Sequence, residues 1–448
     1  MAPTVLLCMG TRPEIIKMAP VYRALAAGPL RPVVVHTGQH GEMAWELYRF
    51  FGMVPDHALA LERERPTLGH LSARLLDGLD RVIAAEAADA VLVHGDTSSA
   101  LAAAMAAFYA GVPVGHVEAG LRSGDLDDPF PEEMNRTLIG RIARWHFAPT
   151  PGAVGHLRDE GVAEHAVALV GNTVVDAVQY GLDALADRDA PPDGMPPDAE
   201  AWLDGADLAL VTMHRRENWG APIADVARAV AETARDHPGL RFLWPVHPNP
   251  AVREAVERGI ARGGGAGGRV RLTGPLSYPA LLCALRRSWL VLTDSGGIQE
   301  EAAALDRPVL VLRQTTERPE VIEAGGGALI GPSGRSVRAW VQELAADDEA
   351  HAAFAGAANP YGDGLTGRRI ADLMVRALGA DRRSVARTGP WVPARALAPC
   401  VAVTPTPAAF PPPAPPEAPD AEAPAAGGDL LVPHLIPSAW PSAVRPTA

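Results

Sequence analysis

Lysine is almost absent from this chain of 448 residues: Lys17 is the only one among 40 cationic residues, and all the others are arginine. A lysine that persists in such a chain is there by chance, or it supplies a compact point charge that the planar guanidinium group cannot replace. Lys17 is therefore a candidate functional residue, with chance kept as the alternative.

Cysteine and long apolar runs are also scarce, which argues against a cysteine metal site, a membrane span and a signal peptide. Cys8, Cys283 and Cys400 have no CxxC or metal-ligand spacing, so we expect Cys8 and Cys283 to be reduced core residues of a cytoplasmic protein without a metal. No apolar run is long enough to cross a bilayer, and no basic N-terminal segment precedes one, so we expect neither a membrane span nor a signal peptide. The net charge of −13 argues against nucleic acid or a membrane surface as the main partner.

Short apolar runs alternate with helix-length amphipathic segments up to about Ala380, the pattern of βαβ units. The predicted strands are Thr4–Met9, Pro32–His36, Ala90–His94, Val112–Val117 and Arg144–Ala148 in a first series, and Leu208–Thr212, Leu240–Val246, Val270–Thr273, Leu290–Thr293 and Pro308–Leu312 in a second. We therefore expect an α/β fold of two Rossmann-like domains facing a central cleft, residues 1–170 and 171–365. Residues 380–448 are rich in Pro and Ala without periodicity, which predicts a disordered tail.

Acidic residues follow two predicted strands of the first half. Asp96 comes just after Ala90–His94, Glu118 comes just after Val112–Val117, and Glu132 lies in a Pro-rich turn further on. In an open parallel sheet, residues just past the carboxyl ends of strands line the ligand crevice. Clustered carboxylates lose solvation and repel one another, so their presence favours a function such as moving a proton on and off a carbon atom.

One candidate phosphate-binding segment follows the first strand. In Gly10-Thr-Arg-Pro-Glu-Ile-Ile-Lys17, Arg12 stands at the expected helix start, and Lys17 lies about one turn further in. A helix N-terminus with two nearby cations favours a diphosphate. The alternative is an ordinary strand-to-helix turn with exposed cations.

A second candidate lies in the other half, in Thr293-Asp-Ser-Gly-Gly-Ile-Gln-Glu-Glu301. Ser295 and the two glycines after it present backbone N–H groups to an anion, and Glu301 is placed to accept hydrogen bonds from ribose hydroxyls. The alternative is a capped turn with a solvated pair of glutamates. Arg318 lies in a further cationic turn downstream.

His214 follows the predicted strand Leu208–Thr212 and precedes two arginines, which favours a functional position. His94, His116 and His247 also lie beside strands, and we take these three as structural. The first strand is not followed by GxGxxG or a Walker A motif, so no nicotinamide cofactor is expected.

These motifs together resemble the bacterial non-hydrolysing UDP-N-acetylglucosamine 2-epimerase family over about residues 4–378. The matching segments are Gly10-Thr-Arg-Pro-Glu14, Thr37-Gly-Gln-His40, His94-Gly-Asp-Thr97, Gly115-His-Val-Glu-Ala-Gly-Leu-Arg122, Pro131-Glu-Glu133, Asn135-Arg136, Gly171-Asn-Thr173, His214-Arg-Arg-Glu217, Pro245-Val-His247, Thr293-Asp-Ser-Gly-Gly-Ile-Gln-Glu-Glu301 and Asn359-Pro-Tyr-Gly-Asp-Gly364.

The resemblance implies a glycosyltransferase-B type fold whose last helix, residues 366–379, returns to the first domain. It implies a cytoplasmic homodimer that interconverts UDP-GlcNAc and UDP-ManNAc without a cofactor and supplies ManNAc units for cell-surface polysaccharide. The catalytic positions that it implies are Asp96, Glu118, Glu132 and His214. The implied UDP-binding positions are Arg12, Lys17, Leu276, Leu281, Ser295, Gly296, Gly297, Glu301 and Arg318.

Two departures from the family pattern stand out. Leu276 and Leu281 replace a polar residue and an aromatic residue of the family's uracil loop, which leaves backbone contacts there. In the segment of the family's second, activating UDP-GlcNAc site, this chain has Gly41 in place of an arginine and an added acid at Glu46. Losing a cation and gaining an anion weakens anion binding, so we expect weaker allosteric activation or none.

Three other functions share parts of this pattern. A hydrolysing epimerase would release free ManNAc and UDP from the same intermediate. A glycosyltransferase would share the fold and the UDP grip but needs an acceptor. A non-catalytic nucleotide-sugar sensor would keep the grip without needing all three acids.

Overall fold

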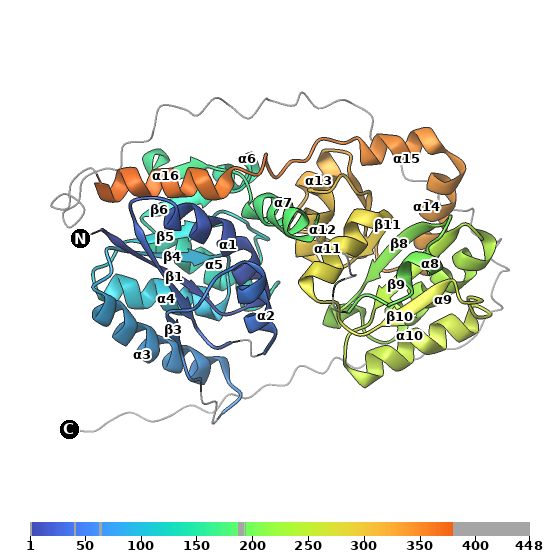
Figure 1. The fold of residues 1–448 in the computed structure, drawn as a ribbon, viewed down its shortest axis with the longest axis horizontal. Coiled ribbons are helices and arrows are strands. Elements are labelled where there is room, and N and C mark those ends of the chain that lie inside the picture. The colour runs from blue at the N-terminus through green and yellow to red at the C-terminus, as the bar shows by residue number, and fades with distance from the viewer. Residues whose placement is uncertain (1, 40–41, 62–64, 187–191, 193, 380–448) are drawn as a thin grey trace, which may run out of the picture. The chain divides into compact units, whose positions relative to one another are not determined.

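The structure, a computed structural model, describes residues 2–39, 42–61, 65–186, 192 and 194–379. The tail predicted for residues 380–448 lies outside the described residues, as do His40, Gly41 and Cys400. Two parallel sheets form the fold (Figure 1). The seven-stranded sheet has the order β3-β2-β1-β4-β5-β6-β7, and the six-stranded sheet has the order β10-β9-β8-β11-β12-β13.

The strands of the first sheet are β1 Thr4–Met9, β2 Arg31–His36, β3 His57–Ala58, β4 Ala90–His94, β5 Val114–Val117, β6 Trp145–Ala148 and β7 Val167–Leu169. Those of the second are β8 Asp207–Thr212, β9 Leu240–Pro245, β10 Val270–Thr273, β11 Ser288–Thr293, β12 Val309–Val311 and β13 Gly327–Leu329. Every strand candidate of the sequence is present within two residues at each end. The short edge strands β3, β7 and β13 were not predicted, because two or three residues carry no apolar periodicity.

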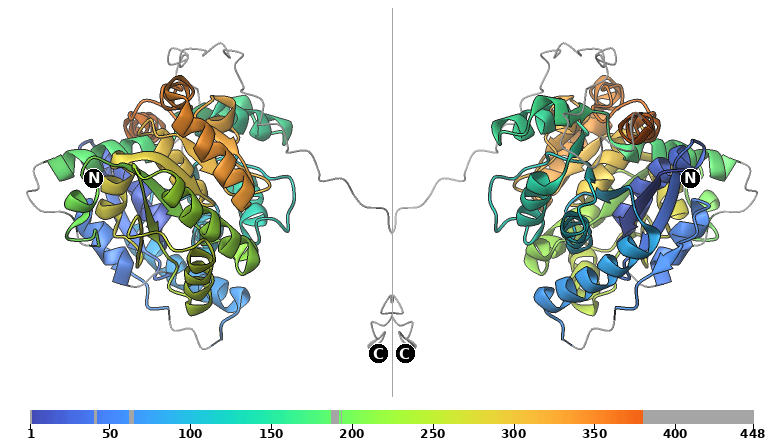
Figure 2. Two further views of the ribbon diagram at one scale, coloured as in Figure 1. Left: turned by 90° about the vertical axis from the view of Figure 1, so that its right-hand side faces the viewer. Right: turned by 90° about the vertical axis from the view of Figure 1, so that its left-hand side faces the viewer.

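Helices connect the strands and cover both faces of each sheet (Figures 1 and 2). The helices between strands of the first sheet are α1 Arg12–Ala26, α2 Glu42–Phe50, α3 Leu68–Glu86, α4 Ser98–Tyr109, α5 Glu132–Ile142 and α6 Pro151–Asp159. Those that follow are α7 Thr173–Ala186, α8 Ala199–Trp202, α9 Ala221–Asp236, α10 Pro250–Arg262, α11 Tyr278–Arg287, α12 Gly296–Ala303, α13 Glu320–Glu323, α14 Gly334–Ala346, α15 Asp348–Ala355 and α16 Thr366–Gly379.

Both faces of the central strands are apolar, as a sheet covered on two sides requires. In β1, Leu7 packs with α1 and α16, whereas Leu6 and Cys8 pack with α3 and α4. In β8, Leu210 packs with α11 and α12, whereas Val211 packs with α9 and α14. Burial raises the pKa of the Cys8 thiol to about 12, consistent with an inert core cysteine.

The strand order is that of the doubly wound Rossmann sheet, so the predicted fold class is confirmed. In each sheet the order reverses beside the first strand, between β1 and β4 and between β8 and β11. Ligands of such sheets bind at the carboxyl ends of strands at these reversals. The segments after β1, β4, β8 and β11 contain most of the predicted site residues, including Arg12, Asp96, His214 and Ser295.

The last helix, α16, packs against α1 and α7. Its first turn is capped by the Asp176 carboxylate of α7, which accepts hydrogen bonds from the backbone N–H groups of Thr366 at 3.2 Å and Gly367 at 2.8 Å. Gly367 lies so close to α1 that a Cβ atom there would come within 2.7 Å of the Pro20 carbonyl. Glycine at this position therefore sets how closely the two helices approach.

Candidate active site

Lys17 lies at the centre of a buried polar cluster contributed by both sheets. Its side chain is 5% exposed, and its ammonium group forms ion pairs with Glu118 and, at 2.6 Å, with Glu300. Burial alone would lower the pKa of Lys17, but the two carboxylates more than offset it and raise the pKa, so the residue is charged. For Lys17, the alternative of an exposed surface cation is wrong.

Glu118 follows β5 in a left-handed backbone conformation with φ 64°, which costs a non-glycine residue roughly 1–2 kcal/mol. Besides Lys17, its Oε2 accepts a hydrogen bond from Asn172 at 3.1 Å and lies 3.6 Å from His94 Nε2. Burial raises the pKa of Glu118, but Lys17 and then His94 lower it well below its usual range. Strained backbone of this kind is typical of functional sites.

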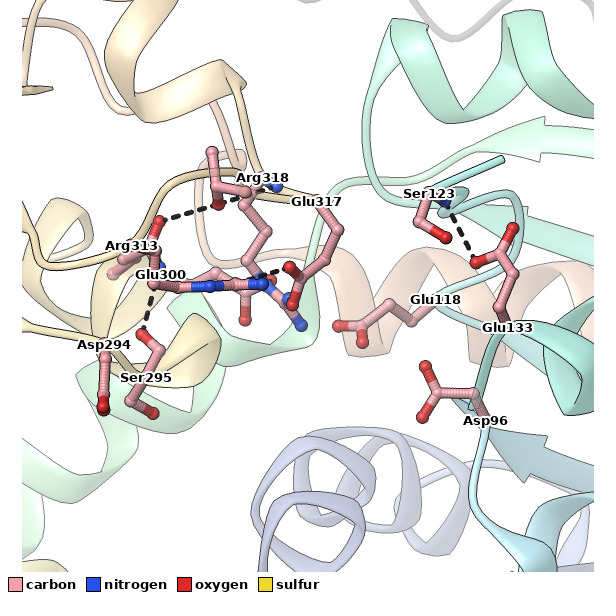
Figure 3. Close-up of polar contacts among 12 residues, drawn as sticks. Asp96, Glu118, Ser123, Glu133, Asp294, Ser295, Glu300, Arg313, Glu317 and Arg318 are labelled. Atoms are coloured by element: carbon pink, nitrogen blue, oxygen red, sulfur yellow. Dashed lines mark hydrogen bonds and ion pairs between the residues drawn. The ribbon is translucent and has the colours of Figure 1, made fainter. Parts of the chain in front are cut away.

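Asp96 follows β4 and lies beside Glu118, with both carboxylates directed toward the residues of the second sheet (Figure 3). Arg136 holds it at 2.6 Å, and Asn135 donates a hydrogen bond to its backbone carbonyl at 2.8 Å. Burial raises the pKa of Asp96, partly offset by Arg136, whereas the charge of Glu118 raises it further. Two neighbouring carboxylates with pKa values shifted in opposite directions are suited to accepting and donating a proton.

Glu132 begins α5 and is half-buried. Burial raises its pKa, its own backbone N–H lowers it, and the nearby charge of Asp96 raises it again. Arg136, one helical turn further along α5, pairs with Asp96 at 2.6 Å, so the start of this helix lies near the Asp96 carboxylate.

On the second-sheet side, Arg318 lies between two carboxylates (Figure 3). It donates to Glu300 at 2.7 Å and to Glu317 at 2.5 Å, and Arg313 also donates to Glu317, at 2.6 Å. The Glu300 side chain is 1% exposed, so the alternative of a solvated glutamate pair is wrong. Glu300, Glu317 and Arg313 were missed by the sequence analysis, because nothing local indicates that their charges are buried.

The N-terminus of α12 has no side-chain cap, and the Arg318 guanidinium group and the Glu317 carboxylate both lie against it. Ser295 precedes it with no side-chain cap, so backbone N–H groups of the first turn, including that of Gly297, have no capping side chain. A Cβ atom at Gly296 would come within 2.5 Å of the Arg318 guanidinium group, which therefore lies directly against the helix start. By contrast, the N–H groups of Gly10 and Thr11 at the start of α1 donate to the protein's own Glu14 carboxyl, at 2.9 and 2.7 Å.

Glu301 is buried next to the charged cluster. Burial raises its pKa to about 7, although Arg12 and Lys17 oppose the shift. Arg12 donates to the Leu276 carbonyl at 3.3 Å and so joins the first domain to the loop before α11. The side chains of Leu276 and Leu281 are buried in the apolar core, so neither offers a polar side-chain group to a ligand.

His214 lies at the end of β8, half exposed, with Nδ1 3.3 Å from the buried Asp294 carboxylate. Asp294 also accepts hydrogen bonds from the backbone N–H groups of His214 and Arg215 and from the Asn218 side chain, between 2.9 and 3.1 Å. Burial lowers the pKa of His214 and Asp294 raises it, with a net lowering. The loop is therefore fixed by Asp294, which the sequence analysis did not assign.

The three histidines that the sequence analysis took as structural, His94, His116 and His247, differ from one another. His116 donates to the Gly95 carbonyl at 2.8 Å, and burial lowers its pKa to about 3, which fits the predicted structural role. His94 instead borders Glu118, so it belongs to the polar cluster. His247 Nδ1 accepts a hydrogen bond from the Asn249 backbone at 3.1 Å, as a structural residue would. Among the described residues, no group of three His, Cys, Asp or Glu side chains is arranged to hold a metal ion.

In both doubly wound sheets, the polar cluster lies where the strand order reverses. This arrangement defines an α/β protein of the glycosyltransferase-B type. A sequence model of the family described as UDP-N-acetylglucosamine 2-epimerase matches residues 23–375. The chain belongs to this family, and the resemblance drawn from its motifs is confirmed.

Relatives match over almost their full length. The chain is 42% identical over 371 residues to UDP-N-acetylglucosamine 2-epimerase of Escherichia coli (strain K12), a match that covers 83% of this chain and 98% of that protein. Among solved structures, it is similar to a putative UDP-N-acetylglucosamine 2-epimerase from Listeria monocytogenes, with TM-score 0.77, 41% identity and coverage of 85% and 98%. It is also similar to the UDP-GlcNAc 2-epimerase from Neisseria meningitidis bound to UDP-GlcNAc, with TM-score 0.75, 35% identity and coverage of 84% and 100%.

Proposed function

We propose that this protein catalyses the reversible C2 epimerisation of UDP-N-acetylglucosamine to UDP-N-acetylmannosamine by elimination and re-addition of UDP. The observation that carries the proposal is the ion pairing of Lys17 with both Glu118 and Glu300. These contacts bring a strand-end carboxylate of the first sheet next to the uncapped helix start and the Arg318 cation of the second. An elimination across C1 and C2 of a nucleotide sugar requires a base for the C2 proton and groups that bind and stabilise the leaving diphosphate.

The C2–H bond of the sugar is not acidified by a carbonyl group, so its proton must leave together with a good leaving group. In the forward step a carboxylate takes the C2 proton, a C1–C2 double bond forms, and the C1–O bond breaks to release UDP and leave 2-acetamidoglucal. In the return step the UDP oxygen attacks C1, and a second acid delivers a proton to the opposite face of C2. Atoms and charge balance without an oxidant.

The residues divide between these tasks. Glu118 is ionised because its pKa is lowered, so we assign it to take the C2 proton, whereas Asp96 and Glu132, with raised pKa values, hold a proton more readily and are assigned to donating one. We assign His214, oriented by Asp294, to the reacting region from the side of the second sheet. A positioned acid or base of this kind contributes on the order of 10²–10⁴ in rate.

The UDP moiety is assigned to the second sheet. The first turn of α12 offers N–H groups for a phosphate, with Arg318 against it and Lys17 across from it. We assign Glu301 to the ribose hydroxyls and the backbone beside Leu276 and Leu281 to the uracil, in a loop whose Leu276 carbonyl accepts a hydrogen bond from Arg12.

Proton exchange with solvent tests the reaction. Incubating the full chain with UDP-GlcNAc in deuterated water, without added metal or NAD, should give UDP-ManNAc that carries deuterium at C2, as followed by NMR. Net accumulation of free ManNAc would instead indicate the hydrolysing reaction. Transfer of the sugar to an added acceptor with retention of the C2 proton would indicate a glycosyltransferase, and binding without turnover would indicate a sensor.

The proposed enzyme is a cytoplasmic homodimer that supplies ManNAc units for cell-surface polysaccharide. Its domains are residues 1–170 and 171–365, and a final helix, residues 366–379, rejoins the first domain.

An apolar groove between α3, α4 and α5 supports self-association, since Leu101, Met105 and the 61%-exposed Phe108 follow one face of α4. On α5, Met134 and Leu138 are exposed beside it. Light scattering should give twice the 47.0 kDa mass of one chain.

Among the described residues, no helix has both the length and the apolar character needed to span a bilayer.

A further inference from the structure

Glu300 joins the two cations that border the proposed diphosphate position. Its Oε2 lies 2.6 Å from Lys17 Nζ, and its Oε1 accepts a hydrogen bond from Arg318 Nε at 2.7 Å. Its side chain is 1% exposed, so water cannot take over either contact. One carboxylate therefore fixes a cation from α1 and a cation from the turn after β12 relative to each other.

The position of this carboxylate is itself fixed by a neutral donor. Asn172 donates to Glu300 Oε1 at 3.2 Å and to Glu118 Oε2 at 3.1 Å. The Asn172 side-chain oxygen accepts from the Val174 backbone at 3.0 Å, and its backbone N–H donates to the Tyr361 carbonyl at 2.7 Å. Glu300 thus cannot turn away from either cation without losing hydrogen bonds in a buried place.

Two like charges in a buried site repel each other, and the charge of Arg318 does oppose protonation of Lys17. A carboxylate between them offsets this repulsion and lets both cations stay ionised. A buried carboxylate beside a phosphate site would by itself disfavour an anionic ligand. Its presence is therefore explained by what it does to the two cations and not by contact with the ligand.

We propose that Glu300 is a positioning residue that holds Lys17 and Arg318 as a preorganised pair for the diphosphate of a nucleotide sugar. The proposal rests on the proposed function, because that function places a diphosphate at the start of α12. It adds a role for a residue that need not touch the substrate.

The substitution Glu300→Gln gives a test in which two physical effects have opposite signs. If Glu300 acts only through its charge, removing the negative charge strengthens UDP binding. If Glu300 acts by positioning, the cations lose their shared partner and move apart, and UDP binding weakens. The sign of the change in UDP affinity therefore separates the two explanations.

The experiment compares UDP with uridine on the full chain, by titration calorimetry for UDP and ligand-observed NMR for uridine. We expect Glu300→Gln to weaken UDP binding by on the order of tenfold, the loss of roughly one charge-assisted contact, and to leave uridine binding nearly unchanged. The matched control is Glu232→Gln, which removes a carboxylate that also holds two arginines, Arg228 at 2.8 Å and Arg338 at 2.7 Å, on the outer helices α9 and α14. The control should keep wild-type affinity for both ligands.

Tighter or unchanged UDP binding by folded Glu300→Gln overturns the proposal, as does an equal loss of uridine and UDP affinity. If this variant does not fold, Glu300→Asp retains the charge but withdraws it by one methylene group. It should then weaken UDP relative to uridine, and an unchanged ratio overturns the proposal. Failure of the proposed function is visible separately, as wild-type protein that binds UDP but does not exchange the C2 proton.

Discussion

Single residues of the site owe their chemistry to neighbours that lie far away in the sequence. Lys17 stays charged although buried, because Glu118 and Glu300 accept its ammonium group. The same contact keeps Glu118 ionised, whereas Asp96 has a raised pKa because burial outweighs its pairing with Arg136. The pKa values of the two carboxylates therefore shift in opposite directions because their balance of burial and cation pairing differs.

Neutral isosteres of these carboxylates should separate chemistry from binding. Asp96→Asn, Glu118→Gln and Glu132→Gln retain side-chain shape but remove the group that accepts or donates the proton. We expect each to lower kcat by on the order of 10²-fold or more, while UDP still binds. Turnover and calorimetric UDP affinity are measured side by side, with Glu254→Gln, which removes the partner of Arg258 at the surface, as control. Near-normal turnover in all three variants would refute their assignment to acid–base chemistry.

Glu301 should make stability depend on pH. Its pKa rises from 4.5 to about 7 on folding, mainly through burial. Its contribution to stability is therefore fully present below the unfolded value and is lost as the pH rises through about 7. Glu301→Gln is neutral at every pH, so the melting temperature of the variant relative to wild type should increase between about pH 5 and about pH 8.

Thermal unfolding at several pH values measures this difference. A tenfold change in proton affinity on folding corresponds to about 1.4 kcal/mol, so the melting temperature should respond by a few degrees. A pH-independent difference between variant and wild type would show that Glu301 is ionised throughout this range in the folded protein.

At the scale of elements, the central strands of both sheets could be predicted from the sequence, whereas the short edge strands could not. The strands β1, β4 and β8 are buried on both faces, and such continuous apolar runs can be recognised in the sequence alone. The candidate site residues directly after these strands could also be predicted, because a parallel sheet brings the carboxyl ends of its strands together at one edge. Glu300 was not, because α12 has only eight residues and no apolar stripe from which its buried side could be deduced.

Close packing of α16 on α1 should make Gly367→Ala destabilising. The added Cβ atom would meet backbone atoms of Pro20 at 2.7 Å, and backbone in a packed helix cannot move aside as a flexible side chain can. Overpacking of this kind costs about 1–3 kcal/mol, which should lower the melting temperature by several degrees.

The matched control for this change is Gly155→Ala in α6, where an added Cβ atom has no neighbour within 4 Å. Because alanine favours the helix over glycine, the control should retain or slightly raise the melting temperature. Equal melting temperatures for Gly367→Ala and wild type would show that α16 shifts on α1 at little cost.

At the scale of the whole molecule, the two sheets share one apolar cluster, which composition and periodicity could not predict. Phe50, the last residue of α2, and Phe51 after it contact Tyr278 of α11, with ring centroids 5.8 and 5.7 Å from that of Tyr278. Tyr180 of α7 packs against both phenylalanines. Arg12 adds a polar contact nearby through the Leu276 carbonyl. Each of these pairs joins segments that only the folded chain brings together.

The contacts that carry the proposed function all lie within residues 2–379. The family match ends at residue 375, and 83% of this chain accounts for 98% of the E. coli relative. Residues 381–448, outside the described residues, match none of the family's motifs and have a composition that disfavours a packed core. We therefore expect a chain that ends at Ala380 to have the kcat, the KM and the melting temperature of the full-length chain, measured side by side under the same conditions. A clear drop in melting temperature would mean that the removed residues pack on the folded part, and a change in KM alone would mean that they reach the substrate site.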